Sequence, residues 1–339
     1  MLTSSATIRS IRSHGYAPAG RGRQWQLMGQ DGGQSVPLKD GRSLFLFSDT
    51  LLAPLSYPDV RNRGRFLANS AALSGRGAGS LMAAMAELSY FSDSEDEPRE
   101  ILTGDSVESA LAVRFWPEHG IQRGEEVVFF YLGIQQAAAG TWGFIEVGSG
   151  IARLDLRTGT CSRWMREGDW RPWPALPVDT HCGVQLMEND GWLLVFCSRP
   201  AGLEYEAFLA RVPMDAIDQP EQYCFYAGEA GWTRMMTAAK PLTQCSSEFS
   251  VAYNEHLGCY VMTYVEGHTK QLCLRTAPQP WGPYSDALRA GVVPHREEAK
   301  IVSLGFQHPQ FDREGGRTIY ISYSQPHFSQ NAIIELTFD

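Results

Sequence analysis

The feature that most constrains the fold of this chain is a pair of strand-like stretches joined by a tight turn, which recurs five times. The second stretch of each pair is a short run of aromatic and branched residues, at positions 44–47, 127–131, 192–196, 260–264 and 318–323. Apolar runs of this length are typical of strands that are buried on both faces. The turn before each run contains a glycine, at Gly41, Gly124, Gly191, Gly258 and Gly316. This combination predicts five β-hairpins.

Further strands are expected on either side of these hairpins. A first strand is predicted ahead of each turn, at residues 35–38, 113–116, 183–186, 249–253 and 308–311. A third strand follows most hairpins, most clearly at residues 151–156, 208–212, 272–275 and 333–336. A unit that repeats in one order favours an all-β, five-bladed β-propeller over a β-sandwich, which needs no internal repetition.

The repeat occupies nearly all of the 339 residues, so a single propeller domain is predicted for residues 1–339. We expect the blades at roughly residues 22–75, 108–160, 180–218, 245–290 and 300–339. The turn glycines are separated by 83, 67, 67 and 58 residues, a looser period than common propeller repeats, which indicates loop insertions. The longest insertion, residues 74–110, contains an acidic run. We interpret it as a solvated surface loop, with a lid over a site as the alternative.

Charge and composition exclude several classes of partner. The chain carries 29 basic and 38 acidic residues, for a formal charge of −9, and no stripe of Lys and Arg. A nucleic acid or an anionic membrane is therefore not expected as a partner. The N-terminus lacks the apolar stretch of a secretory signal, and no apolar segment is long enough to span a bilayer. We expect a cytoplasmic protein, or a secreted one if a signal peptide has been removed from the precursor.

Sequence motifs for cofactors are absent. The seven cysteines include no CxxC pair, which favours reduced thiols, and the chain has no phosphate-binding loop, no HExxH and no GxSxG. No cofactor is predicted. His181 and Cys182 lack a second ligand at informative spacing, so no metal site is predicted either.

Chemically active side chains are expected at one mouth of the propeller channel. In a blade, the start of the innermost strand and the end of the second strand meet at that mouth. The starts of first strands supply Asp31, His181, Glu248 and His308, and the ends of second strands supply Asp49, Arg199, Glu266 and Ser324. This gathering of carboxylates, imidazoles and a guanidinium predicts a site for a carbohydrate or another polar small molecule.

Two of these residues, Asp31 and Asp49, belong to the same predicted hairpin. An aspartate after a strand also caps turns, but two carboxylates around a sugar ring are the machinery of glycoside hydrolysis. Glu248 is expected to hold a hydroxyl or tune an aspartate, or else to accept backbone N–H bonds. His308 is expected either to bind substrate or to bridge neighbouring blades. Aromatic rings stack on sugars, and Trp116 and Trp142 are predicted to lie nearest the channel.

Six short motifs together resemble bacterial propeller glycosidases that include the endo-D-arabinanases. The motifs are Gln30-Asp31-Gly32-Gly33 and residues 44–50, 69–73, 247–250, 281–284 and 308–311. The resemblance implies a five-bladed propeller that cleaves arabinofuranose-containing polymers, with two first-blade aspartates as acid and base. These match Asp31, taken as the base, and Asp49, taken as the acid, and the motif at 69–73 adds Asn69 as a candidate substrate-binding residue.

This chain departs from that family in two respects. Ser48 stands where the family more often has glycine, and the export signal of a cell-wall enzyme is missing. These departures leave open a second hypothesis, a cytoplasmic propeller with the same site frame that binds a glycan or catalyses cyclase- or isomerase-like acid/base chemistry in specialised metabolism. A protein-interaction propeller is a third reading, which leaves the carboxylates unexplained.

Overall fold

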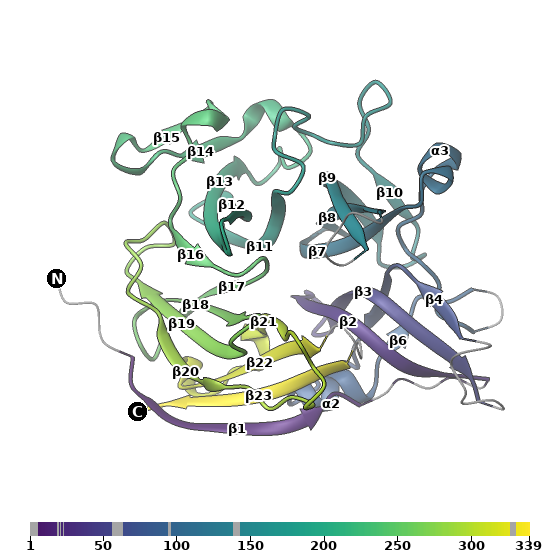
Figure 1. Cartoon of the computed structure of the whole chain (residues 1–339), viewed down its shortest axis with the longest axis horizontal. Helices are drawn as coiled ribbons and strands as arrows, with labels where there is room; N and C mark the ends of the chain where they lie inside the picture. Colours follow the sequence, from purple (N-terminus) through teal and green to yellow (C-terminus); the bar gives the residue numbers. More distant parts are fainter. Residues whose placement is uncertain are drawn as a thin grey trace.

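The computed structural model describes residues 6–18, 20, 22, 24–55, 64–93, 96–137, 143–325 and 330–339. Five antiparallel sheets surround a central axis, as the view in Figure 1 shows. This arrangement is a five-bladed β-propeller and confirms the predicted fold class.

Each blade begins with its innermost strand. Blade 1 is built from β2 (Trp25–Pro37), β3 (Ser43–Pro54), β5 (Ser70–Leu73) and β6 (Ser89–Tyr90), with β4 (Arg65–Leu67) beside β3. Blade 2 contains β7 (Val113–Arg123), β8 (Glu126–Gln136), β9 (Phe144–Asp155) and β10 (Cys161–Arg163). Blade 3 contains β11 (His181–Asn189), β12 (Trp192–Ala201), β13 (Glu204–Pro213), β14 (Cys224–Tyr226), β15 (Trp232–Thr233) and β16 (Thr243–Cys245).

The remaining blades are four-stranded. Blade 4 contains β17 (Ser250–Asn254), β18 (Cys259–Glu266), β19 (Gln271–Ala277) and β20 (Leu288–Val292). Blade 5 contains β21 (Ser303–Gln307), β22 (Thr318–Gln325), β23 (Gln330–Phe338) and β1 (Ile8–Tyr16). The short helices are α2 (Leu81–Ala86), α3 (Ser106–Ala110), η1 (Pro220–Gln222), η2 (Gly228–Ala230), η3 (Met236–Ala238), η4 (Pro309–Phe311) and η5 (Glu314–Gly316). No helix in these described ranges is both long and apolar enough to cross a bilayer.

The first and last strands of the chain close the ring together. β1 pairs antiparallel with β23, so the N-terminal segment forms the outermost strand of the blade that the C-terminus completes. This strand has no signal in the sequence and was not predicted, because residues 8–16 are mostly exposed and lack a buried apolar run. Pairing of distant segments in one blade ties the two ends of the chain together.

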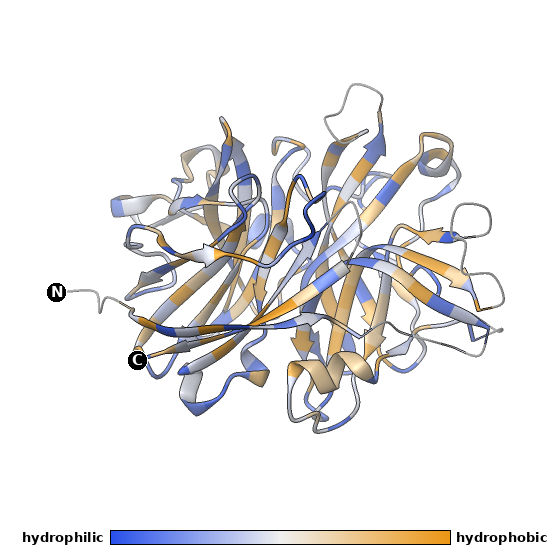
Figure 2. Ribbon diagram, turned by 60° about the horizontal axis from the view of Figure 1, so that its bottom comes forward, coloured by the Kyte–Doolittle hydropathy of each residue, from blue (hydrophilic) through white to orange (hydrophobic). Residues whose placement is uncertain are grey.

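The hydrophobic core lies between blades. One cluster packs Leu44 and Leu46 of blade 1 against Phe129 of blade 2, and similar clusters fill the next three interfaces around the ring. A fifth packs Phe45 of blade 1 against Tyr320 of blade 5. Side chains of alternating direction in one strand therefore serve two interfaces, which explains the continuous apolar runs. Figure 2 shows hydrophobic residues along the strands and many hydrophilic ones in the connecting loops.

The insertion at residues 74–110 differs from the predicted solvated loop. Leu81 and Met85 of α2 pack into the core between blades 5 and 1, and Ile101 and Leu102 are buried between blades 1 and 2. β6, which also lies in this segment, pairs with β5. Several parts of the insertion therefore pack against blade 1 and its neighbours.

The prediction of a first strand at residues 308–311 was wrong. These residues form η4 after His308, because Pro309 has no N–H to donate to a ladder and starts a helical turn. The innermost strand of blade 5 is β21, directly before them.

Candidate active site

Bulges in the inner strands turn polar side chains out of the regular ladder. The pairing of β2 with β3 shifts register between Gln30 and Gln34, and that of β7 with β8 shifts between Pro117 and Gly120. Similar shifts interrupt β11 and β21. Because a bulge changes the direction of a side chain, such irregularities are common beside functional sites. Asp31 lies in the first bulge and Glu118 in the second.

The Asp31-Gly32-Gly33 sequence explains the bulge in β2. Gly32 and Gly33 have φ angles of 78° and 96°, which side chains with a Cβ rarely adopt. A Cβ on Gly32 would also lie 2.9 Å from the Ser48 backbone nitrogen. In this backbone conformation the Gly32 amide donates a hydrogen bond to Asp31 Oδ1 at 2.8 Å.

The structure brings Asp31 and Asp49 together on adjacent strands of blade 1. Burial raises the pKa of Asp49 to about 7, the Asp31 charge adds to the shift, and Arg114 opposes it. Trp116 Nε1 donates to Asp49 Oδ1 at 2.8 Å. Burial also raises the pKa of Asp31, opposed by the Ser324 hydroxyl and the Gly32 amide. At neutral pH the pair can hold one proton and one negative charge.

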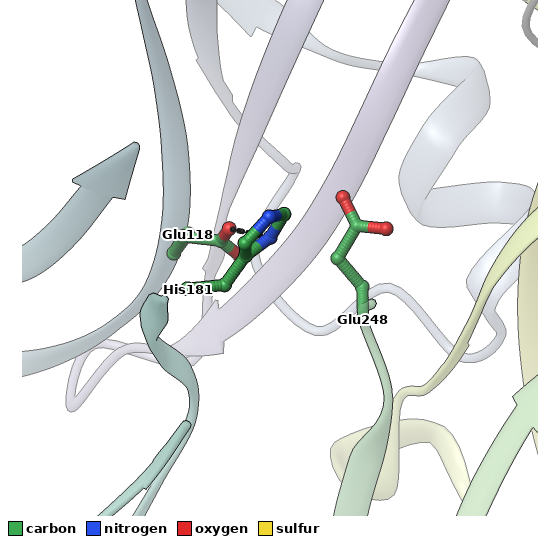
Figure 3. A group of neighbouring side chains, drawn as sticks. All are labelled: Glu118, His181 and Glu248. Atoms are coloured by element: carbon green, nitrogen blue, oxygen red, sulfur yellow. Dashed lines mark ion pairs between the residues drawn. The ribbon is translucent and has the colours of Figure 1, made fainter. Parts of the chain in front are cut away.

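A second group of ionisable side chains comes from blades 2, 3 and 4. His181 opens β11, with its Nδ1 3.6 Å from Glu118 Oε1 and its Nε2 3.9 Å from Glu146 Oε1. Glu248 precedes β17, and Figure 3 shows it on the side of the imidazole opposite Glu118. Burial lowers the pKa of His181, but the Glu118 and Glu146 carboxylates outweigh this effect and raise it to about 10.

The charges of the aspartate pair and of the residues around His181 affect one another. Burial raises the pKa of Glu248 to about 7, and the charges of Glu118 and Asp31 push it in the same direction. Burial likewise raises the pKa of Glu118, while His181 lowers it. The arrangement combines carboxyls that hold protons near neutral pH with carboxylates that stay ionised, which is the requirement for acid/base chemistry.

Other predicted site residues lie in different surroundings. His308 is fully buried between Ser35 Oγ, 2.6 Å from its Nδ1, and Ser322 Oγ, 2.8 Å from its Nε2. These contacts join blades 1 and 5 beyond the last residue of β21, whereas Ser324 pairs with the first residue of that strand. The contacts of His308 are therefore those expected of a residue that bridges neighbouring blades. It lies beyond the opposite end of β21 from Ser324.

Three further residues have contacts outside the aspartate pair. The Asn69 side chain makes four hydrogen bonds to the backbone of Ile101, Leu102 and Phe115, which attach the insertion to blade 1. The Arg199 guanidinium stacks 4.4 Å from the centre of the Phe208 ring. Glu266 accepts a hydrogen bond from Arg289 Nη2 at 3.0 Å. Trp142 lies outside the described residues.

Sequence reasoning missed Glu118 and Glu146. Glu118 stands between Pro117 and Gly120, in a stretch noted only for Trp116. Proline and glycine inside a predicted strand indicate a bulge, and that signal was available. Glu146 offers no such signal, because only the fold of blade 2 brings β9 beside β11.

Residues 20–333 match a protein family described as a domain of unknown function, DUF5005. The chain belongs to this family. No curated protein matches the chain. The family assignment is compatible with the resemblance stated from the motifs, although the endo-arabinanase type is not established by it.

Solved structures share the propeller fold at low sequence identity. A candidate hydrolase from Bacteroides ovatus is similar with a TM-score of 0.67 and 14% identity, over 99% of this chain and 93% of that chain. A glycoside hydrolase family 43 enzyme from Xanthomonas citri gives 0.51 and 15%, over 91% and 87%. An α-L-arabinofuranosidase from Podospora anserina gives 0.50 and 10%, over 98% and 97%. At these identities the similarity establishes the fold.

Proposed function

We propose that this protein is a glycoside hydrolase in which Asp49 is the general acid and Asp31 the general base. The observation that carries the proposal is the pair of interacting carboxyls on β2 and β3, with the pKa of Asp49 raised to about 7. Two carboxyls in different protonation states are what glycosidic cleavage requires. The solved propellers named as glycoside hydrolases lend support at the level of the fold.

Asp49 has the surroundings of the acid. Its raised pKa keeps a proton on the carboxyl near neutral pH, ready for the departing glycosidic oxygen. The Trp116 indole N–H occupies Asp49 Oδ1, so Oδ2 is the oxygen that remains for the proton. Once the proton has left, the Trp116 donor and the Arg114 charge stabilise the carboxylate.

Asp31 has the surroundings of the base. The Gly32 amide donates to its Oδ1, and the Ser324 hydroxyl favours its ionised form. An ionised Asp31 in turn favours the proton on Asp49, because two neighbouring carboxyls resist carrying two charges. In this role Asp31 either takes a proton from water or attacks the sugar carbon. The distance between the two carboxyls decides which of these two mechanisms operates.

We propose a furanoside as the substrate class, with arabinofuranose-containing glycans first. The motifs that resemble endo-D-arabinanases support this assignment, as does the Podospora anserina fold relative, whose name is α-L-arabinofuranosidase. Trp116, held against Phe144 with ring centres 4.8 Å apart, offers an aromatic edge beside the acid. Glu248, which interacts with the charge of Asp31, and the neighbouring His181 supply further polar groups.

The test is hydrolysis of arabinan, arabinogalactan and aryl arabinofuranosides by the wild-type chain and by Asp31→Asn and Asp49→Asn. Each variant should lose roughly 10²–10⁴-fold in kcat, the contribution of a positioned acid or base. Asp312→Asn is the matched control, because burial raises the pKa of Asp312 to about 7 as well, but its carboxyl contacts Gln307 and the Tyr320 amide in blade 5.

Unchanged turnover in both aspartate variants would refute the catalytic assignment. Saturable binding of an arabinan oligosaccharide without hydrolysis of any substrate would favour the glycan-binding propeller. Aryl substrates with a good leaving group separate the two roles further, since they need little acid assistance. Asp49→Asn should therefore retain more activity on them than Asp31→Asn does.

A further inference from the structure

Three ligand-type side chains meet in the channel from three different blades. Glu118 lies in the bulge of β7, His181 starts β11, and Glu248 stands two residues before β17. One donor atom from each lies within 4.8 Å of the other two. Figure 3 shows the imidazole between the two carboxylates. Residues this far apart in sequence have no motif spacing, which is why no metal site was predicted.

An unmet hydrogen-bonding requirement at His181 is an independent sign of a missing ligand. His181 is 5% exposed and Glu118 4% exposed. Within the described part of the chain, neither ring nitrogen of His181 has a hydrogen-bond partner, since the carboxylate oxygens of Glu118 and Glu146, at 3.6 and 3.9 Å, are beyond hydrogen-bond distance. Buried polar atoms are almost always partnered in native proteins, by protein, water or an ion.

The donor spacing fits a divalent cation. Two ligands on opposite sides of a metal are separated by about 4–5 Å, twice a metal–ligand distance of about 2.0–2.6 Å, and neighbouring ligands by less. The three donors satisfy that limit. With Nδ1 towards the ion and Glu118, Nε2 faces Glu146 Oε1 at 3.9 Å, the side on which a carboxylate orients a ligating imidazole in metal sites.

The charge of the site also favours a cation. Among the described residues no lysine or arginine pairs with Glu118 or Glu248, and the cation beside Glu118 is the imidazole of His181, whose proton a bound metal ion would replace. Glu146 adds a third carboxylate at the edge of the cluster, and the charge of Asp31 is felt at Glu248. Carboxylates withdrawn from water need a positive partner.

We propose that Glu118, His181 and Glu248 bind one divalent first-row transition-metal ion, such as Zn²⁺ or Mn²⁺. One imidazole and two carboxylates favour these ions over Ca²⁺, which prefers six to eight oxygen ligands. Three protein ligands leave a coordination position for water or a substrate hydroxyl. The site does not rest on the proposed hydrolase function, because binding is measured without a substrate.

The test is calorimetric titration of the full chain, stripped with a chelator, with ZnCl₂, MnCl₂ and CaCl₂ in separate experiments. We expect one equivalent of Zn²⁺ or Mn²⁺ to bind, with an affinity at least tenfold above that for Ca²⁺. Glu118→Gln, His181→Gln and Glu248→Gln should each weaken binding by about 100-fold or more, whereas Asp312→Asn should bind as the wild type does.

Thermal unfolding of the metal-free variants shows whether each still folds. If the buried substitutions Glu118→Gln or His181→Gln do not fold, Glu248→Gln carries the test, because Glu248 is only partly buried. A wild-type chain that takes up none of the three ions, or a Glu248→Gln variant with unchanged affinity, would overturn the site. Tighter binding of Ca²⁺ than of Zn²⁺ and Mn²⁺ would overturn the choice of a transition metal. Loss of glycosidase activity bears on none of these outcomes.

Discussion

His181 and His308 are both buried near the innermost strands of the propeller, yet their pKa values shift in opposite directions. His308 lies between two serine hydroxyls, and burial lowers its pKa to about 3. His181 lies between carboxylates that raise its pKa to about 10 in spite of burial. The partners of a buried group, rather than its burial, thus decide its charge.

The contrast extends to the surroundings of the two histidines. Near His308 the contacts are neutral hydrogen bonds: Gln310 donates to Ser35 Oγ at 2.8 Å, which leaves the Ser35 hydroxyl to donate to His308 Nδ1. This network of neutral hydrogen bonds joins the two blades and contains no charged side chain. Around His181 the groups are charged and incompletely partnered. The contacts of His308 hold neighbouring blades together, whereas the surroundings of His181 contain charged groups.

The largest expected effect is a loss of stability on replacing His308, whose surroundings are neutral hydrogen bonds. His308→Ala should lower the free energy of unfolding by about 3 kcal/mol, since it leaves two buried hydroxyls without their partner and opens a cavity. Folded His308 stays neutral, whereas the unfolded histidine gains a proton below its ordinary pKa of 6.5, so the wild type loses stability below about pH 6.5 and the Ala variant does not. In urea denaturation the loss should therefore be constant from pH 7 to pH 9 and become smaller towards pH 5. His256→Ala, at an exposed loop histidine, is the control and should change stability little. A loss of the same size at pH 5 as at pH 8 would contradict a lowered pKa of His308 in the folded protein.

Asp49→Asn should stabilise the protein, by about 2 kcal/mol at pH 8. The folded pKa of Asp49, about 7, lies above its ordinary value of 3.8, so the folded chain holds an extra proton between these values. The free energy of unfolding of the wild type therefore falls as pH rises from about 4 to 7. The upper bound on this fall is about 4 kcal/mol, and the partial exposure of Asp49 reduces it by roughly half. The amide has no such penalty.

Denaturation of the wild type and of Asp49→Asn between pH 4 and pH 8 tests the direction of this stability difference. They should be equally stable at pH 4 and diverge above it, with the Asp49→Asn variant the more stable. Asp312→Asn should show a similar gain while keeping full activity, because its carboxyl lies outside the proposed catalytic pair. Equal stability of wild type and Asp49→Asn at pH 8 would mean that Asp49 is not desolvated.

The activity of the proposed hydrolase should fall as pH rises above about 7. Asp49 must carry a proton to act as the acid, and its pKa of about 7 sets the alkaline limb of kcat/KM. The expected decline is tenfold for each pH unit beyond that value. An aryl substrate that needs no protonation should show a shallower limb, whereas an identical limb for both substrates would assign the titration to another group.

Much of the fold could be predicted from sequence because its signals are local. Five apolar runs, each after a glycine turn, report the second strand of every blade directly. Four of the hairpins form as expected, whereas in blade 5 the apolar run pairs with β21 and not with residues 308–311. β1 could not be predicted, because an exposed edge strand has no apolar pattern and is fixed by its partner β23. The strand expected at 308–311 was wrong because Pro309 begins a helical turn there.

The candidate site was predictable where the position of a residue in its blade places it, as for the aspartates of one hairpin and for His181 and Glu248 at the starts of first strands, but Glu118 in its bulge was missed. Asp31 and Asp49 lie on paired strands, so hairpin geometry alone places them near each other. Glu118, His181 and Glu248 come from three blades, and their meeting depends on bulges and on the curvature of the ring. His308 was expected beside Asp31 because its strand was misplaced by a few residues. A shift that small moves a side chain from one end of the channel to the other.

The smallest expected effect concerns the indole that contacts the acid. Trp116→Phe removes the N–H that donates to Asp49 Oδ1 and stabilises its ionised form, while a phenyl ring can keep the edge contact with Phe144. The pKa of Asp49 should therefore rise, and the alkaline limb of kcat/KM should move up by less than about one pH unit. Trp192→Phe, at an indole stacked on Arg211 in blade 3, should leave the limb in place. A downward shift in Trp116→Phe would mean that the indole acts on Asp49 through packing rather than through its hydrogen bond.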